Sequence, residues 1–122
     1  VMTTRKKIDA IDVNMSVEKA LNYMLDEPYS RYPLYEDDID NIVGVLYLKD
    51  VIDAYLNQKE ATLSDIAREP FFVHQTMNLS VLFQEMQTKK IHMAIVIDEY
   101  SQTEGIVSME DRGHSREYFR RI

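Results

Sequence analysis

The sequence predicts an α+β fold made of two β-α-β-β-α units packed as a pseudo-twofold pair, each with a small mixed sheet and helices on one side. Three observations predict it. The 122 residues contain an internal repeat, with a period of about 60 residues. Within each copy, strand-like apolar runs alternate with apolar stripes at the helical spacing i, i+3, i+4, i+7. Hydrophobic residues make up 45% and charged residues 29% of the chain, as in ordinary globular domains.

Two matching heptapeptides mark the repeat. Gly44–Asp50 reads Gly-Val-Leu-Tyr-Leu-Lys-Asp, and Gly105–Asp111 reads Gly-Ile-Val-Ser-Met-Glu-Asp. Further matches lie upstream: Val17, Ala20, Leu21 and Met24 with Leu79, Leu82, Phe83 and Met86, and Tyr32–Tyr35 with Met93–Val96. The offset is 61 or 62 residues throughout, so one single-residue gap is enough. We therefore expect one unit over residues 1–60 and the other over residues 61–122, neither of which can bury much surface alone.

The first unit reads as strand, helix, strand, strand, helix. Ile8–Val13 predicts a short strand, and the helix that follows has Asn14 or Ser16 available as its N-cap. Glu27-Pro28 ends this helix, because a residue before proline is pushed out of the α region. The remaining expected elements are the strands Tyr32–Tyr35 and Ile42–Leu48 around an acidic turn at Glu36–Asn41, the helix Lys49–Gln58 with Val51, Ile52, Tyr55 and Leu56 inward, and a polar join at 59–65.

The second unit repeats this order as far as its last strand. Its expected elements are the strand Phe71–Val73, the helix Leu79–Thr88, the strand Ala94–Ile97, a turn at Asp98–Thr103 and the strand Gly105–Met109. Ala94–Ile97 is apolar without alternation, which predicts a strand buried on both faces. The tail 112–122 has a glycine in what would be the first turn of a helix and no apolar stripe, which disfavours the last helix of this unit.

Composition and charge narrow the possible functions. A net charge of −7 argues against non-specific nucleic-acid binding, and the absence of cysteine removes disulfides, zinc ribbons and thiol nucleophiles. The three histidines lack the i, i+4 spacing of a helical metal pair. There is no apolar run of about 18 residues and no signal-like N-terminus, so we expect a soluble, non-exported chain. No nucleophile–base pair or metal cluster appears, so we expect a regulatory or binding domain and no enzyme.

The heptapeptides carry the clearest functional signal. A glycine allows close approach of a backbone or a ligand, and an aspartate at a helix start can accept hydrogen bonds from the two hydroxyls of a ribose. Ser108 adds a hydroxyl near the same expected helix N-terminus, which favours anions. The alternative is that Asp50 and Asp111 are simply N-caps and the glycines are bulges. Spacing alone leaves both open.

Tyr29-Ser30-Arg31 is a second candidate. An arginine beside an exposed tyrosine suits stacking on a base and pairing with a phosphate, although by itself such a pair is more often surface packing. The repeat makes His92, preceded by Lys89-Lys90, the counterpart of Arg31, which would put a cation at this point in both units. The acidic turn lacks the spacing of a calcium loop, and we interpret it as a solvated hairpin loop.

These motifs resemble a known family. The segments Val1–Thr3, Tyr29–Tyr35, Asp40–Asp50, Lys90–Tyr100 and Gly105–Asp111 are similar to a tandem pair of cystathionine-β-synthase (CBS) domains, a Bateman module. More narrowly, the sequence resembles the pair found in the CorC/HlyC-type magnesium and cobalt efflux family, over residues 1–111.

The resemblance implies regulation by a ligand without chemistry. CBS pairs bind AMP, ADP or ATP in clefts between their two units, and two pairs often associate, so we expect a homodimer. Carried over by motif, Ser108 and Asp111 would hold ribose and phosphate, Thr3 would contact the adenosine, and Tyr29 and Arg31 would contact base and phosphates. The ligand would be AMP or ATP, the latter with or without Mg²⁺, and no catalytic cofactor is implied. The pair would lie on the cytoplasmic face of a membrane domain of the same full-length protein.

The second cleft has weaker residues. Its aspartate would be Asp50 and its cation His92, but Tyr47 stands where the hydroxyl residue would be, so we expect this cleft to be weak or empty. Ser108 also replaces the commoner threonine, and Thr4 a usual proline. Two alternatives remain open: a structural dimerisation module whose clefts bind nothing, and a different ligand such as S-adenosylmethionine or a dinucleotide.

Overall fold

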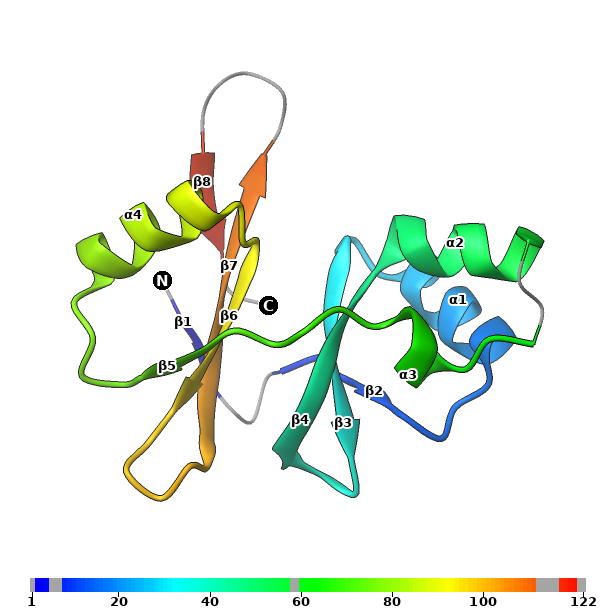
Figure 1. Ribbon diagram of the computed structural model, residues 1–122, viewed down its shortest axis with the longest axis horizontal. Helices are drawn as coiled ribbons and strands as arrows, with labels where there is room; N and C mark the ends of the chain where they lie inside the picture. The colour runs from blue at the N-terminus through cyan, green and yellow to red at the C-terminus, as the bar shows by residue number, and fades with distance from the viewer. Residues whose placement is uncertain (1, 5–7, 58–59, 112–116, 121–122) are drawn as a thin grey trace. The chain divides into compact units, whose positions relative to one another are not determined.

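The computed structural model describes residues 2–4, 8–57, 60–111 and 117–120. The chain divides into two compact units, one formed by Asp9–Pro70 and the other by residues 1–8 together with 71–122. Each unit contains one sheet (Figure 1). The sequence places the boundary after residue 60, whereas the structure keeps residues 61–70 with the first sheet and adds the opening segment to the second.

The unit Asp9–Pro70 has a three-stranded mixed sheet. Strand β2 (Ile11–Asp12) pairs in parallel with β3 (Arg31–Glu36), which pairs antiparallel with β4 (Asp38–Tyr47). Three helices accompany it: α1 (Val17–Asp26), α2 (Leu48–Asn57) and α3 (Leu63–Ile66). The predicted mixed sheet and order of elements are confirmed, although the first strand is shorter than Ile8–Val13.

The ends of α1 follow from the local sequence. The Ser16 hydroxyl accepts a hydrogen bond from the Lys19 backbone N–H at 3.2 Å and so caps the helix, as predicted. The helix ends at Asp26, immediately before Glu27-Pro28. Its buried residues Ala20, Leu21 and Met24 form the predicted apolar stripe.

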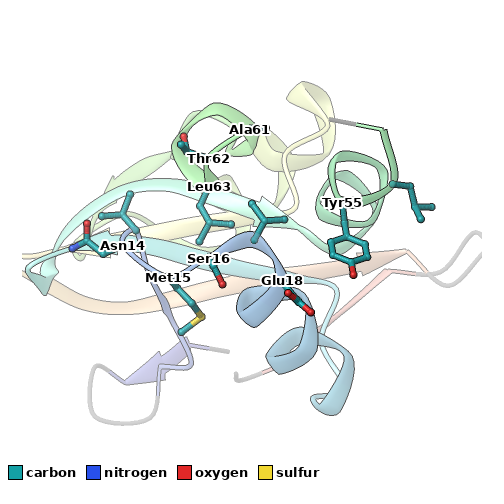
Figure 2. Close-up of a pocket in the computed structure, with 11 residues that line it drawn as sticks. Asn14, Met15, Ser16, Glu18, Tyr55, Ala61, Thr62 and Leu63 are labelled. Carbon is teal, nitrogen blue, oxygen red and sulfur yellow. The ribbon is translucent and has the colours of Figure 1, made fainter. Parts of the chain in front are cut away.

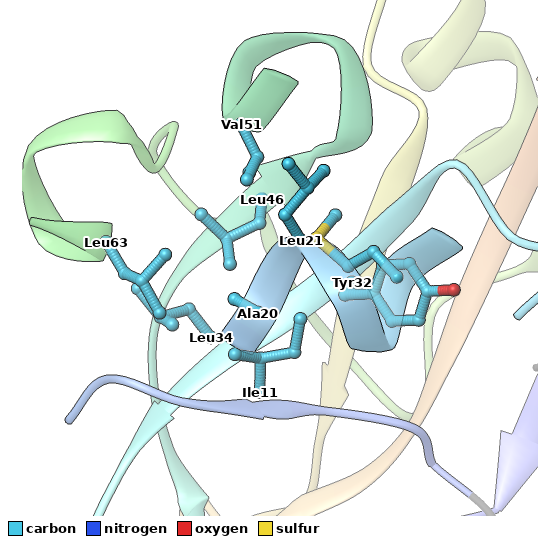
Figure 3. Close-up of a cluster of buried hydrophobic side chains, with 9 residues drawn as sticks. Ile11, Ala20, Leu21, Tyr32, Leu34, Leu46, Val51 and Leu63 are labelled. Atoms are coloured by element: carbon cyan, nitrogen blue, oxygen red, sulfur yellow. The ribbon is translucent and has the colours of Figure 1, made fainter. Parts of the chain in front are cut away.

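The core of this unit takes side chains from every one of its elements. The buried cluster, shown in Figure 3, consists of Ile11, Ala20, Leu21, Met24, Tyr32, Leu34, Leu46, Val51 and Leu63. Leu63 comes from α3, a short helix that overlaps the segment 59–65 predicted as a polar join. Thr62 and Asp65 start α3 with reciprocal side-chain-to-backbone hydrogen bonds, and these bonds lower the pKa of Asp65.

Two expectations for this unit are wrong. Helix α2 buries Val51 and Ala54, while Ile52, Tyr55 and Leu56 are 36%, 41% and 66% exposed. Leu63 of α3 contributes to the core in place of the expected α2 residues. The acidic segment Glu36–Asn41 is almost entirely strand, and only Asp37, with φ of 73°, lies between β3 and β4. Aspartate is among the few residues that tolerate this left-handed conformation.

The other unit has a larger sheet. Its strands are β1 (Met2–Thr4), β5 (Phe72–His74), β6 (Met93–Ile97), β7 (Thr103–Asp111) and β8 (Glu117–Arg120), and α4 (Leu79–Lys89) is its helix. The order is β1-β7-β6-β5, with β8 also pairing with β7. Met93–Val96 are buried, which agrees with the prediction for this strand. The strands β1 and β8 were not predicted from the sequence.

The tail extends the sheet and adds no helix among the described residues. Strand β7 continues through Asp111, and β8 pairs with it from Ser108 opposite Arg120 to Asp111 opposite Glu117. The glycine in the expected first turn and the missing apolar stripe of the tail predict this absence of a helix. The segment 112–116 lies outside the described residues.

Tyr23 and Tyr32, in the core region of the unit Asp9–Pro70, lead to a prediction of how stability changes at alkaline pH. Burial raises the pKa of Tyr32 to about 12, and burial with a hydrogen bond to Asp9 also raises the pKa of Tyr23. Unfolded tyrosines titrate near pH 10. The folded protein therefore retains protons that the unfolded chain loses, and the free energy of unfolding should decline as pH rises from about 10 to about 12.

Urea unfolding at pH 8 and pH 11 measures this decline. Tyr32→Phe removes one of the two raised tyrosines, so its stability should fall less between these pH values than that of wild type. Tyr100→Phe, at a tyrosine that is 77% exposed, is the matched control and should follow wild type. Equal declines in all three proteins would contradict this assignment.

Candidate functional site

The first heptapeptide is crossed by another stretch of backbone. A Cβ on Gly44 would lie 2.8 Å from the Ala67 Cβ and 3.2 Å from the Arg68 carbonyl oxygen. Val45 and Arg68 exchange two backbone hydrogen bonds, each 2.9 Å long, as an isolated antiparallel bridge. The structure shows both features that the sequence left open for this glycine: the close approach of a backbone at Gly44, and a β-bulge-like register shift in the β3–β4 pairing between Gly44 and Ile42.

Arg68 then reaches the other two residues of interest in that heptapeptide. Its Nε and Nη2 donate to the two carboxylate oxygens of Asp50 at 2.8 Å and 3.2 Å, and this bond raises the pKa of Arg68. Its guanidinium carbon lies 3.9 Å from the centre of the Tyr47 ring. Asp50 lies in the first turn of α2, which begins at Leu48, so it is not the N-cap. Arg68 thus contacts both Tyr47 and Asp50, the residues predicted for the weaker cleft.

Arg31 lies beside the same tyrosine ring. Arg31 and Tyr47 are direct partners across β3 and β4, and the Arg31 guanidinium carbon is 5.1 Å from the ring centre. The Arg31 Nε is buried and has no hydrogen-bond partner among the residues that the structure describes. The sequence assigned Arg31 and Tyr47 to different clefts, and the structure makes them neighbours in one unit.

Tyr29 contributes to packing. Its ring meets the buried Tyr32 ring edge-on, with centroids 6.1 Å apart, and it packs against the first core. The packing role that the sequence left open for Tyr29 is therefore present, and its ring is only partly buried.

The register of the strands corrects one predicted correspondence. Arg31 pairs with Tyr47, and in the other unit Met93 pairs with Ser108. Tyr47 and Ser108 occupy the same heptapeptide position, so the counterpart of Arg31 is Met93 and the assignment to His92 is wrong. The offset is 62 residues before the hairpin and 61 after it, which places the single-residue gap in the hairpin. The two units therefore do not both have a cation at this point.

The remaining predicted residues lie in the other unit. Thr3 is in β1 opposite Ile106 of β7, and Ser108 and Asp111 are in β7 itself. His92 precedes β6, where its carbonyl accepts a hydrogen bond from Met109 N–H at 2.9 Å. The eight predicted residues thus form two groups: Thr3, His92, Ser108 and Asp111 in one unit, and Tyr29, Arg31, Tyr47 and Asp50 in the other.

The expected anion site at a helix start beside Ser108 is not present in the described part of the chain. Ser108 is 2% exposed, and residues 108–111 pair with β8 as strand. The backbone N–H groups that would face an anion at a helix N-terminus belong here to an extended segment. The sequence placed Asp111 at a helix start, and this is wrong: the structure has Ser108 and Asp111 on one strand, β7, which pairs with β1, the strand that contains Thr3.

A pocket of about 810 Å³ lies within the unit Asp9–Pro70, as Figure 2 shows. It is lined by Val13–Glu18, by Tyr55 and Leu56, and by Ala61–Leu63. None of the predicted site residues lines it. Across the described segments, no three histidine or acidic side chains are grouped to hold a metal ion, and no helix has the length and apolarity needed to cross a membrane.

With this geometry established, comparison with known proteins identifies the family. The sequence model of the CBS-domain family matches this chain twice, at residues 1–57 and 63–111. The chain therefore belongs to the CBS-domain family and contains two such domains in tandem. Its relatives place it with the hemolysin-like proteins of the CNNM/CorC family, which confirms the resemblance stated from the sequence.

The curated relatives are much longer than this chain. Hemolysin C of Brachyspira hyodysenteriae is 41% identical over 111 residues, which are 91% of this chain and 41% of the relative. The UPF0053 protein YugS of Bacillus subtilis is 37% identical over 111 residues, 91% of this chain and 26% of the relative. The chain thus spans less than half the length of either protein.

Solved structures agree in fold. The CBS domain of a bacterial CNNM/CorC family Mg²⁺ transporter, in complex with ATP, is 38% identical with a TM-score of 0.81, covering 88% of this chain and 78% of that one. A hemolysin-like protein containing a CBS domain, from Oenococcus oeni, is 36% identical with a TM-score of 0.80, covering 88% and 80%. A CBS-domain pair with bound AMP from Klebsiella pneumoniae is 27% identical with a TM-score of 0.75, covering 88% and 87%.

The contact at Gly44 predicts a specific stability pattern. Gly44→Ala should lower the free energy of unfolding by about 1–3 kcal/mol, because its new methyl group meets the Ala67 side chain and the Arg68 backbone. Ala67→Gly removes the nearest atom, so the double variant should recover part of the loss. A double-mutant cycle in urea measures this coupling, and independent, additive effects would contradict the contact.

Proposed function

We propose that this chain is the adenine-nucleotide-binding regulatory part of a hemolysin-like, CNNM/CorC-type membrane protein. The observation that carries the proposal is the ATP complex of a CBS domain that is 38% identical and has the same fold. The AMP complex of a more distant pair supports the same ligand class. The chain acts by binding, and we assign it no catalytic step.

The proposed ligand-binding residues are those that the family motif predicts. Asp111 and Ser108 hold ribose and phosphate, Thr3 contacts the adenosine, and Tyr29 and Arg31 contact base and phosphates. The buried Arg31 Nε, which has no partner among the described residues, supports a phosphate contact, because an unpaired guanidinium N–H gains most from an anionic acceptor.

The charge of the chain bears on the choice of nucleotide. With a net charge of −7, the protein repels the several negative charges of free ATP. We therefore propose that ATP binds together with Mg²⁺, whereas AMP needs no such ion. Either ligand regulates only through a difference in its affinity for two states of the full-length protein.

The full-length protein supplies the remaining parts of the proposal. The relatives extend well beyond the matched region, and the similar transporter carries Mg²⁺. We propose that this chain lies at the cytoplasmic face of a membrane domain in the same polypeptide, and that the transported ion is magnesium or cobalt.

A homodimer is the second part of the proposal. Helices α1 and α2 leave four large apolar side chains exposed: Leu25, Ile52, Tyr55 and Leu56. Apolar groups gathered on neighbouring helices favour association with another protein surface, and a second copy of this chain is the partner we propose. The competing function, a dimerisation module that binds no nucleotide, is favoured by the contact of Arg68 with Asp50.

Isothermal titration with AMP, and with ATP in the presence and absence of Mg²⁺, tests nucleotide binding. Wild type should bind about one nucleotide per chain, and Asp111→Ala should bind at least about tenfold more weakly because it loses the hydrogen bonds to ribose. Asp26→Ala, at an exposed acid that ends α1, is the control and should match wild type.

Two results would contradict this assignment. Unchanged affinity in Asp111→Ala would mean that the nucleotide binds elsewhere. No heat with any nucleotide, from protein shown to be folded, would favour the dimerisation module.

Sedimentation velocity tests the dimer. Wild type should sediment as a dimer at micromolar concentration, and Leu56→Glu should shift it toward monomer by placing a charge on the exposed apolar face. Val43→Glu places the same charge on an exposed strand residue and should leave the dimer intact. A monomeric wild type, or equal dissociation of both variants, would rule out this surface.

A further inference from the structure

The aspartate of the first heptapeptide, Asp50, is bound by a residue from outside that heptapeptide. In the first, both carboxylate oxygens of Asp50 accept hydrogen bonds from Arg68. Arg68 does not belong to the heptapeptide, since it comes from the segment that follows α3, 18 residues further along the chain. The sequence explained the weakness of this cleft by Tyr47 alone, whereas the structure brings in a second residue.

Backbone hydrogen bonds fix the position of the Arg68 main chain, from which its side chain extends. The paired hydrogen bonds to Val45 hold its main chain against β4, and Gly44 provides the room for it. From that position the guanidinium covers the Tyr47 ring at 3.9 Å and donates to Asp50 in a two-point fork. Stacking and a bidentate bond together select arginine, because lysine has no planar group and offers a single charged nitrogen.

The contacts of Arg68 are of the kind a nucleoside would make. A ribose donates two hydroxyl groups to one aspartate, and a base stacks on an aromatic ring. Arg68 donates two N–H groups to Asp50 and lies on Tyr47. The pair is reachable from solvent, since the side chains of Arg68 and Asp50 are 46% and 27% exposed.

We propose that Arg68 is a built-in occupant that closes the second predicted nucleotide position, the one that contains Asp50. The proposal rests on the proposed function in one respect, that an adenine nucleotide is the ligand class of these positions. Arg68 donates to both carboxylate oxygens of Asp50 within the chain and covers the ring beside it. Nucleotide is thereby excluded from this position whatever occupies the other.

The test compares two variants that differ only in Arg68. Tyr47→Ser gives the first heptapeptide the hydroxyl that Ser108 gives the second, and it leaves the Arg68–Asp50 bond in place. Tyr47→Ser/Arg68→Ala also removes the proposed occupant while keeping the backbone bridge to Val45. Isothermal titration with AMP measures the number of nucleotides bound per chain, and thermal unfolding followed by circular dichroism confirms that each variant is folded.

We expect the double variant to bind one more AMP per chain than Tyr47→Ser, at least about tenfold more tightly than any additional binding by Tyr47→Ser. Adding Asp50→Ala to the double variant should abolish this extra event. Arg68→Ala removes a positive charge, so a gain in binding of anionic AMP could not come from general electrostatic attraction.

Three results would overturn the proposal: no extra binding in the double variant, an extra equivalent already present in Tyr47→Ser, or extra binding that survives Asp50→Ala. Failure of the proposed function is a separate result, seen as absence of binding by wild type. In that case, binding that appears in the double variant and is absent from Tyr47→Ser would still support closure by Arg68, and binding by neither variant would overturn it.

Discussion

The approach of Arg68 to β4 links the sheet, the core and Asp50 in the unit Asp9–Pro70. Two backbone hydrogen bonds join Val45 to Arg68, and the missing side chain of Gly44 makes them possible. This bridge fixes the segment that leaves α3, and α3 in turn places Leu63 in the core. One glycine therefore connects the structure of the sheet, the filling of the core and the occupation of Asp50.

Most of the fold could be predicted because it is determined locally. The Ser16 cap, the proline that follows α1 and the apolar stripe of α1 each act within a few residues of chain, and the structure reproduces them. The inner face of α2 could not be predicted in the same way. The apolar residues at 51, 52, 55 and 56 were all candidates for burial, but only Val51 of these is buried, together with Ala54, because Leu63 of α3 fills part of the core.

The candidate site shows a similar division. A repeat alignment cannot decide whether a one-residue gap lies before or after a strand, because neighbouring positions of an apolar strand look alike. The strand register places the gap, and it shows that the residue equivalent to Arg31 in the other unit is Met93 and not His92. Arg68 gave no signal in the sequence, because its role arises from a long-range backbone bridge and from no pattern around it. Its partners Tyr47 and Asp50 could be predicted, since they belong to the repeated motif.

Under the proposed function, the arrangement around Tyr47 keeps one cation of this acidic chain available for an anionic ligand. Two guanidinium groups contact this ring, Arg31 at 5.1 Å and Arg68 at 3.9 Å. Asp50 neutralises Arg68 through two hydrogen bonds, which reduces the repulsion between the two arginines. The charge of Arg31 is then the one in this group that a phosphate would meet. Both proposed roles, closure of one position by Arg68 and a phosphate contact by Arg31, would therefore follow from the same ion pair.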